Sequence, residues 1–165
     1  MTLGSDRSQQ KSGRMILIVD DEKFNCDIIY GFLMILGFKN RKELTRFAYN
    51  GEQAVEQVKQ AIQEGDPNRF GLIVMDCNMP FLDGYEATKR IRKIFTGQGI
   101  SKEMMPQIIA ITGHVEKEYM KKAVECGMDK VYSKPFPAAE FGKLLFSLKL
   151  IDSIPEHLRE DSHEE

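Results

Sequence analysis

The sequence of 165 residues has no tryptophan and only three cysteines, Cys26, Cys77 and Cys126. The cysteines are odd in number and far apart, without metal-ligand spacing, which argues against a disulfide framework or a zinc site. We expect reduced, semi-buried thiols, as in a reducing compartment. No apolar run approaches the roughly 18 residues of a membrane span, and the start of the chain lacks the apolar region of a signal peptide. These absences favour a cytoplasmic (intracellular) protein with no membrane segment.

A dominant charge and a glycine-rich phosphate loop are also missing. The formal net charge is −2, from 23 Lys and Arg against 25 Asp and Glu, which gives no support for direct nucleic-acid binding. Without a Gly-rich loop, nucleotide binding finds no support either. What is present is a globular composition, 42% hydrophobic and 29% charged, in a chain long enough for one domain with a full core.

The two ends of the chain differ from its middle. Residues 1–13 are polar and rich in Ser, Gly and Gln, and we expect a flexible lead there. Residues 150–165 are acidic and contain Pro155, which is typical of a tail or the start of a linker. The folded domain is therefore expected to span residues 14–149.

Five short apolar runs predict strands, and helical periodicity follows each of them. Residues 15–19, 72–75 and 107–111 have no polar alternation, which is typical of central strands buried on both faces. Weaker strands are predicted at 43–49 and 131–133. Spacings of three and four predict helices over 24–36, 54–62, 85–95, 119–124 and 141–148. The buried face of the first helix is expected to consist of Phe24, Ile28, Phe32, Ile35 and Leu36.

Five repeats of strand and helix predict an α/β fold with a parallel sheet covered on both faces. Right-handed crossovers leave few topologies. We prefer the flavodoxin-like, doubly wound (βα)5 order 2-1-3-4-5, which sets the first and third strands side by side at the switch point. That order brings Asp20, Asp21 and Asp76 together at one edge of the sheet.

Four strand ends carry polar groups: Asp20 with Asp21, then Asp76, Thr112 and Lys134. Three adjacent carboxylates repel one another unless a cation or a proton is present. Mg²⁺ is a suitable cation, because it binds one or two carboxylates together with water and phosphate oxygens. A hydroxyl and an ammonium group suit phosphoryl oxygens, and an aspartate can act as a nucleophile that carries an aspartyl phosphate.

Short motifs stand in order at the strand ends. They are Val19-Asp20-Asp21 with Asn25, Met75-Asp76-Cys77-Asn78-Met79-Pro80, Asp83-Gly84, Ile111-Thr112, Gly127-Met128-Asp129 and Ser133-Lys134-Pro135-Phe136. In these motifs, from about residue 14 to residue 148, the chain resembles the receiver domain of two-component response regulators. The resemblance is greatest to receivers attached to hybrid histidine kinases, so we expect a piece of such a kinase rather than a single-domain regulator.

The resemblance implies a role for each acidic residue. Asp76 would be the phosphoacceptor. Asp21 would bind Mg²⁺ directly and Asp20 mainly through water, with Asp76 and the backbone carbonyl of Asn78 as further ligands.

The resemblance also implies the remaining site residues. Thr112 would be the switch hydroxyl, Lys134 would contact the phosphoryl group, and the Lys134–Pro135 bond would be cis. Asn78 and His114 would tune how long the phosphoryl group lasts.

One position departs from the family pattern. Receivers commonly have Tyr or Phe three residues before the lysine, whereas this chain has Val131 there and Tyr132 one residue later. Because side chains alternate faces along a strand, Tyr132 is not expected to take over the task of that aromatic residue. The sequence therefore does not support the usual aromatic readout.

The favoured hypothesis is a phospho-switch that receives its phosphoryl group from a histidine kinase or a histidine phosphotransfer protein. A phosphorylation-independent interaction module on the same fold is the alternative, and the complete acidic, Thr and Lys set argues against it. A haloacid-dehalogenase-like enzyme carries its nucleophile after the first strand with a second Asp two residues on, whereas here the third strand ends in Asp76 and Asn78 follows. We expect no stand-alone metabolic enzyme beyond self-catalysed phosphorylation and dephosphorylation. The three histidines are not expected to be phosphoryl donors.

Overall fold

The computed structural model describes residues 13–159 and contains a single parallel sheet within that range. Its strands are β1 (Met15–Val19), β2 (Thr45–Ala48), β3 (Phe70–Asp76), β4 (Gln107–Thr112) and β5 (Lys130–Ser133). They lie in the order β2-β1-β3-β4-β5, and every neighbouring pair is parallel. The predicted flavodoxin-like topology is confirmed.

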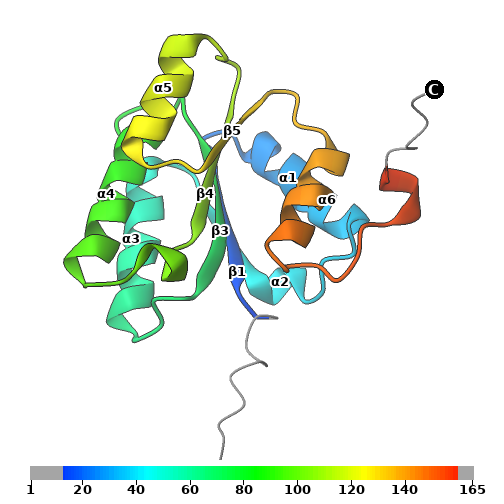
Figure 1. Cartoon of the computed structure of the whole chain (residues 1–165), viewed down its shortest axis with the longest axis horizontal. Coiled ribbons are helices and arrows are strands. Elements are labelled where there is room, and N and C mark those ends of the chain that lie inside the picture. Colours follow the sequence, from blue (N-terminus) through cyan, green and yellow to red (C-terminus); the bar gives the residue numbers. More distant parts are fainter. Residues whose placement is uncertain (1–12, 160–165) are drawn as a thin grey trace, which may run out of the picture.

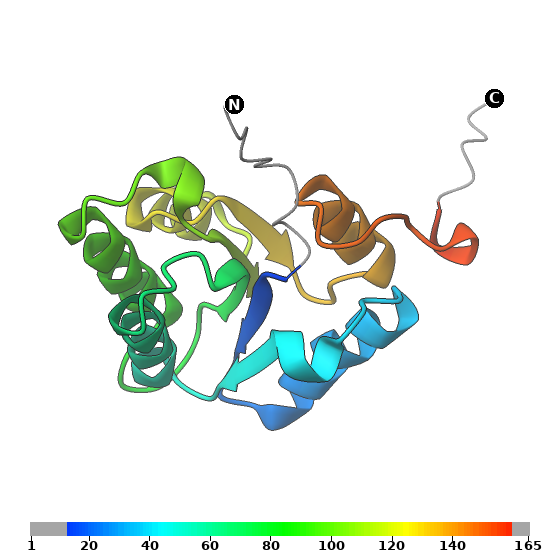
Figure 2. The same cartoon turned by 90° about the horizontal axis from the view of Figure 1, so that it is seen from below.

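Two helical layers cover the sheet (Figure 1). The helices are α1 (Lys23–Ile35), α2 (Arg41–Leu44), α3 (Gly51–Gln63), α4 (Gly84–Gly97), α5 (Lys117–Cys126) and α6 (Ala138–Ser147), with short 3-10 turns η1 (Lys102–Met104) and η2 (Glu156–Leu158). Helices α3, α4 and α5 lie on one face, and α1 and α6 lie on the other. The view from below shows the strands between these layers, with the short α2 leading into the edge strand β2 (Figure 2).

Alternation along the strands divides the core in two. Leu17, Val19, Ile73 and Met75 pack under α3, α4 and α5, whereas their neighbours Ile16, Ile18, Leu72 and Val74 pack under α1 and α6. This is the period of two that a pleated strand imposes. Both faces of β3 are buried along its whole length, so its last side chain, that of Asp76, is held at a fixed place.

The predicted buried face of α1 is only partly right: Leu36 is 2% exposed and Phe32 packs against the core, but Phe24 and Ile28 do not belong to the buried face. Cys26, Ile29 and Leu33 are buried, while Phe24 is 72% exposed and Ile28 is 40% exposed. Apolar residues surround most of α1, so the spacing of three and four fits more than one stripe. The helix buries the stripe that meets the sheet and leaves apolar side chains in solvent.

Two boundaries also differ from the expectation. Residues 41–44, half of which were assigned to the second strand, form α2, and β2 is only four residues long. Residues 150–158, expected to begin an acidic tail, pack against the core of α1 and α6, where Ile151 is 8% exposed. The expected lead at 1–12 and the end of the expected tail at 160–165 lie outside the described residues. Between residues 13 and 159, no helix is long and apolar enough to cross a membrane.

Candidate functional site

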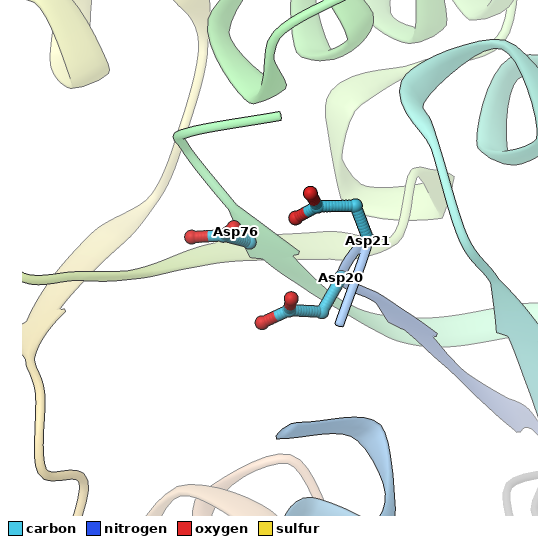
Figure 3. Close-up of side chains that lie close together, drawn as sticks. All are labelled: Asp20, Asp21 and Asp76. Atoms are coloured by element: carbon cyan, nitrogen blue, oxygen red, sulfur yellow. The ribbon is translucent and has the colours of Figure 1, made fainter. Parts of the chain in front are cut away.

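The three predicted acidic residues meet where β1 and β3 end. Val19 pairs with Met75 in the parallel register, so the next residues, Asp20 and Asp76, leave the sheet side by side. Asp20 is 7% exposed and Asp76 is 6% exposed, whereas Asp21 is open to solvent. One oxygen from each carboxylate lies within 4.8 Å of the other two (Figure 3). The site is therefore an acidic cluster with two buried members and one exposed member.

The loop after Asp76 is packed tightly against the start of α4. The backbone N–H of Gly84 donates to the carbonyl of Cys77 at 3.1 Å. A Cβ at Gly84 would lie only 2.1 Å from the backbone oxygen of Asp76, so no larger residue fits there without moving the chain. Asp83 caps α4 by accepting the N–H of Glu86 at 2.8 Å. The Asp-Gly pair thus holds the phosphoacceptor candidate in position.

Lys134 supplies the positive charge that faces the acids. Its Nζ lies 3.3 Å from Oδ1 of Asp76 and 3.7 Å from Oδ2 of Asp20. Its backbone N–H donates to the carbonyl of Thr112 at 2.8 Å, and the bond to Pro135 is cis. Burial alone would lower the pKa of Lys134, but the two carboxylates outweigh that effect and raise it.

The carboxyl group of Asp76 is harder to ionise than that of a solvent-exposed aspartate. Burial, and then repulsion from Asp20, raise its pKa from 3.8 to about 6, although Lys134 and the backbone N–H of Asn78 both favour the charged form. One lysine does not balance three acids. A divalent cation would relieve this repulsion, and a donor set made only of oxygen atoms suits Mg²⁺. The residues present therefore fit that ion.

Thr112 and His114 lie beside the acids at the end of β4. The hydroxyl of Thr112 is buried and accepts the backbone N–H of His114 at 3.1 Å. The ring of His114 reaches the other tuning candidate, because its Nε2 lies 3.3 Å from Nδ2 of Asn78. The ring also packs against Tyr119 at 4.8 Å between centroids, and Nδ1 lies 3.9 Å from Glu116. No pattern in the sequence predicts these last two contacts.

A cavity of about 430 Å³ lies beside the acids, beneath α1. Its walls are mostly apolar and include Ile28, Phe32, Pro135 and Phe136. The helical spacing predicted that Ile28 and Phe32 belong to the core, so this opening was not expected. The helical pattern does not show which apolar side chains stop short of the sheet.

The structure separates Val131 from Tyr132 as strand alternation predicts. Val131 packs against the core under α3, α4 and α5, and Tyr132 packs against the opposite core. The ring of Tyr132 lies 4.5 Å from that of Phe136, between centroids. Tyr132 is therefore committed to the α1 and α6 side of the sheet.

Known proteins are similar to this chain in sequence and in fold. The family model described as the response regulator receiver domain matches residues 16–146. The chemotaxis protein CheY of Halobacterium salinarum is 35% identical over 123 residues, which cover 74% of this chain and 86% of that protein. Probable histidine kinase 2 of Oryza sativa subsp. indica is 32% identical over 140 residues, which cover 81% of this chain but only 12% of that kinase.

Solved structures agree with the fold. The receiver domain of the histidine kinase CKI1 from Arabidopsis thaliana, complexed with Mg²⁺ and BeF3−, matches with a TM-score of 0.65 and 27% identity, covering 83% of this chain and 90% of that one. The receiver domain of the sensor histidine kinase PA1611 from Pseudomonas aeruginosa has a magnesium ion coordinated in its active site cleft. It matches with a TM-score of 0.63 and 29% identity, covering 82% of this chain and 97% of that one.

Proposed function

The chain belongs to the response regulator receiver domain family, and from this premise we propose that Asp76 accepts a phosphoryl group from a phosphohistidine donor. The observation that carries the proposal is the burial of Asp76 at the end of a central strand, between a second buried acid and Lys134. A carboxylate held at one place, with a cation on one side, is suited to nucleophilic attack on phosphorus.

We assign the metal site to Asp20, Asp21 and Asp76, with the backbone carbonyl of Asn78 as a further ligand. The magnesium ions in the CKI1 and PA1611 receiver structures support this assignment. When bound, the ion offsets negative charge on the phosphoryl oxygens and on the three carboxylates. Asp21, the exposed member, would hold the ion at the side of the site that is open to solvent.

The transfer forms one bond and breaks one. An oxygen of the Asp76 carboxylate attacks phosphorus, the P–N bond to the donor histidine breaks, and its electron pair returns to the imidazole ring. Attack requires ionised Asp76, and a pKa of about 6 leaves most of it ionised at neutral pH even before an ion binds. Lys134 and Thr112 hold the transferred phosphoryl oxygens by an ammonium contact and a hydroxyl hydrogen bond.

Loss of the phosphoryl group requires water to reach the same site. Asn78 and His114 stand over its rim and contact one another, so they control that access. New charge on Asp76 draws Thr112 and Lys134 inward, and α5 and β5 then move to a second packing that a partner reads. The readout does not use an inward-swinging aromatic ring on β5, because Tyr132 faces the opposite core.

We place the chain in the cytoplasm, as a piece of a hybrid histidine kinase, with a histidine kinase or a phosphotransfer protein as its partner. Three free, buried cysteines suit a reducing compartment. The match to one eighth of a plant histidine kinase supports the proposal that this chain is a piece of a longer kinase. Nothing favours the phosphorylation-independent alternative, because every position of the acceptor site is occupied by a suitable residue.

Mass spectrometry after incubation with Mg²⁺ and acetyl phosphate tests the acceptor role. We expect a gain of about 80 Da, the mass of one phosphoryl group, that is lost in alkali and is absent from Asp76→Asn. Chelation of Mg²⁺ should remove the adduct, and Asp152→Asn, an exposed acid paired only with Lys39, should retain it. An unmodified wild-type chain with both acetyl phosphate and a phosphohistidine protein would overturn the proposal.

A further inference from the structure

Phe81, in the loop after Asp76, has an unusual backbone conformation. Its φ is +68°, and the N–H of Leu82 donates to the carbonyl of Pro80 at 2.9 Å, which closes a three-residue γ-turn around it. A γ-turn with its central residue in the left-handed region is rare and strained, above all for a bulky side chain. Besides glycines, only Asn40 and Lys149 share a positive φ among residues 13–159.

The side chain of Phe81 contributes nothing to packing. Its exposed fraction is 102%, the highest among the large hydrophobic residues of the described chain. An exposed phenyl ring gains no burial on folding, and a phenylalanine in this backbone conformation is less favourable than an asparagine or a glycine. The residue therefore carries two penalties for the fold and no compensating contact within it.

The loop holds Phe81 outward rather than leaving it loose. Met79 and Leu82, on either side of it, are 7% and 6% exposed and belong to the core under α3, α4 and α5. A Cβ at Gly51, the first residue of α3, would lie 2.5 Å from the backbone oxygen of Leu82, so the loop rests directly on that helix. The ring is displayed on a rigid support.

A second exposed aromatic residue follows the other buried acid, Asp20. Phe24 lies in the first turn of α1, just after Asp20 and Asp21, and is 72% exposed. Helix α1 covers one face of the sheet, and the Phe81 loop leads to α4 on the opposite face (Figure 1). Each exposed phenyl ring therefore follows a buried acid of the cluster closely along the chain, Phe24 four residues after Asp20 and Phe81 five residues after Asp76.

We propose that Phe81, assisted by Phe24, is the docking anchor for the protein that delivers the phosphoryl group. The inference rests on the proposed function. Because Asp76 is buried at the bottom of the site, a donor histidine can reach it only if the surface around that histidine covers the rim. Around the start of α1, Asp21, Glu22 and Asp27 are exposed together with a single cation, Lys23, so this segment is net acidic. The matching donor surface has an apolar depression beside its histidine and basic residues around it.

The substitution Phe81→Asn separates docking from chemistry and from folding. Asparagine adopts the left-handed conformation more readily, so the variant should be at least as stable as wild type in thermal unfolding. Its phosphorylation by acetyl phosphate should be unchanged, because that donor is too small to touch Phe81. Phosphorylation by a protein donor should slow about tenfold or more, as expected for removal of an interface anchor. Phe24→Gln should slow the same reaction.

The matched control is Phe146→Gln. Phe146 is also half-exposed, in the last turn of α6, a helix that runs away from the edge where the acids lie. Acetyl phosphate and the protein donor should both phosphorylate this variant at the wild-type rate. The protein donor is whichever member of a panel of phosphorylated histidine kinases and phosphotransfer proteins modifies the wild-type chain fastest.

The outcomes separate the two proposals. A wild-type chain that no donor phosphorylates overturns the acceptor role and the docking proposal together. If the phosphorylation rate of Phe81→Asn falls equally with acetyl phosphate and with the protein donor, then Phe81 supports the site itself. That result overturns the docking proposal but leaves the acceptor role intact. The docking proposal is also overturned if Phe81→Asn is phosphorylated by the protein donor at the wild-type rate, or if no protein in the panel phosphorylates the wild-type chain faster than acetyl phosphate does. Light scattering tests whether Phe81 binds a second copy of this chain instead of a donor protein. Loss of self-association in Phe81→Asn would show that it does, and would overturn the docking proposal.

Discussion

The two edges of the sheet differ in how far their charged side chains are paired within the chain. At the edge where the strands begin, the guanidinium of Arg92 donates to the carbonyls of Gly127 and Pro106, both at 2.9 Å, and to Oδ2 of Asp129 at 2.7 Å. The same carboxylate oxygen accepts the backbone N–H of Ile108 at 2.8 Å. All three nitrogens of the guanidinium and one oxygen of the carboxylate therefore have partners within the chain.

At the edge where the strands end, three carboxylates share one lysine. The side chains of Asp76 and Asp20 are 7% and 9% exposed, against 15% and 16% for Arg92 and Asp129, and the pKa of Asp76 rises to about 6 because of burial and its acidic neighbour. Exposed Phe24 and strained Phe81 stand at the same edge. Aspartate therefore stabilises the fold at one edge and destabilises it at the other, and the difference is whether its charge has a partner inside the chain.

Arg92→Ala should give the largest loss of stability. It leaves Asp129 as a poorly solvated charge without its cation and two carbonyls without their donors, which should cost about 3 kcal/mol in the free energy of unfolding. Urea denaturation measures the loss. At low temperature, where the variant is still folded, acetyl phosphate should phosphorylate it at the wild-type rate, because the two edges are independent.

Arg90→Ala is the control on the same helix. Arg90 is half-exposed and lies 3.6 Å from Glu86 in a surface pair, so the change should stay below about 0.5 kcal/mol. Equal effects at the two arginines would contradict the view that the Arg92 group ties this edge together.

Gly84→Ala should affect both stability and phosphorylation. The new Cβ would collide with the backbone oxygen of Asp76, so the end of β3 or the start of α4 must move, at about 2 kcal/mol. The shift also displaces the acceptor, and the initial rate of adduct formation with acetyl phosphate should fall with it. Gly31→Ala, within α1 and with nothing inside 4 Å, should instead raise stability slightly. A Gly84→Ala protein as active and as stable as wild type would show that the loop is not tightly packed.

The edge with the acids was readable from the sequence, whereas at the other edge only the motif Gly127-Met128-Asp129 stood out, without its partner Arg92. Asp20, Asp76, Thr112 and Lys134 each follow an apolar run, and parallel topology alone gathers such residues at one edge. Arg92 gave no such signal, because its partners lie 14 to 37 residues away and no spacing rule connects them.

The same limit explains the other misses. The face of α1 was misassigned because apolar residues surround the helix, so only the position of the sheet decides which of them are buried. Phe81 was not noticed because Pro80 and the Asp83-Gly84 pair indicate a turn, but not which residue adopts the positive φ. Sequence periodicity predicts which face of a single helix or strand is apolar. The features that were missed depend instead on contacts among several elements.

Asp76→Asn should have a smaller effect on stability than Arg92→Ala or Gly84→Ala, and it should be a gain. In the absence of Mg²⁺, the pKa of Asp76 is about 6 in the folded chain and near 3.8 when unfolded. Between these values the folded state holds more protons, so the contribution of Asp76 to stability falls as pH rises from about 4 through 6. Removing the charge should add about 1 kcal/mol at pH 7, since solvent at the rim screens part of the repulsion, and almost nothing at pH 3.5.

Asp129→Asn makes the same chemical change at the other edge, and its effect should have the opposite sign. Asp129 loses its ion pair with Arg92, so the free energy of unfolding at pH 7 should fall. Urea titrations of both variants in EDTA, at pH 7 and at pH 3.5, measure the two effects. If Asp76→Asn also destabilises the chain at pH 7, then Asp76 is a structural partner of Lys134 and the two edges do not differ in kind. A gain that grows with pH identifies the acidic edge as the one that gives up stability for chemistry.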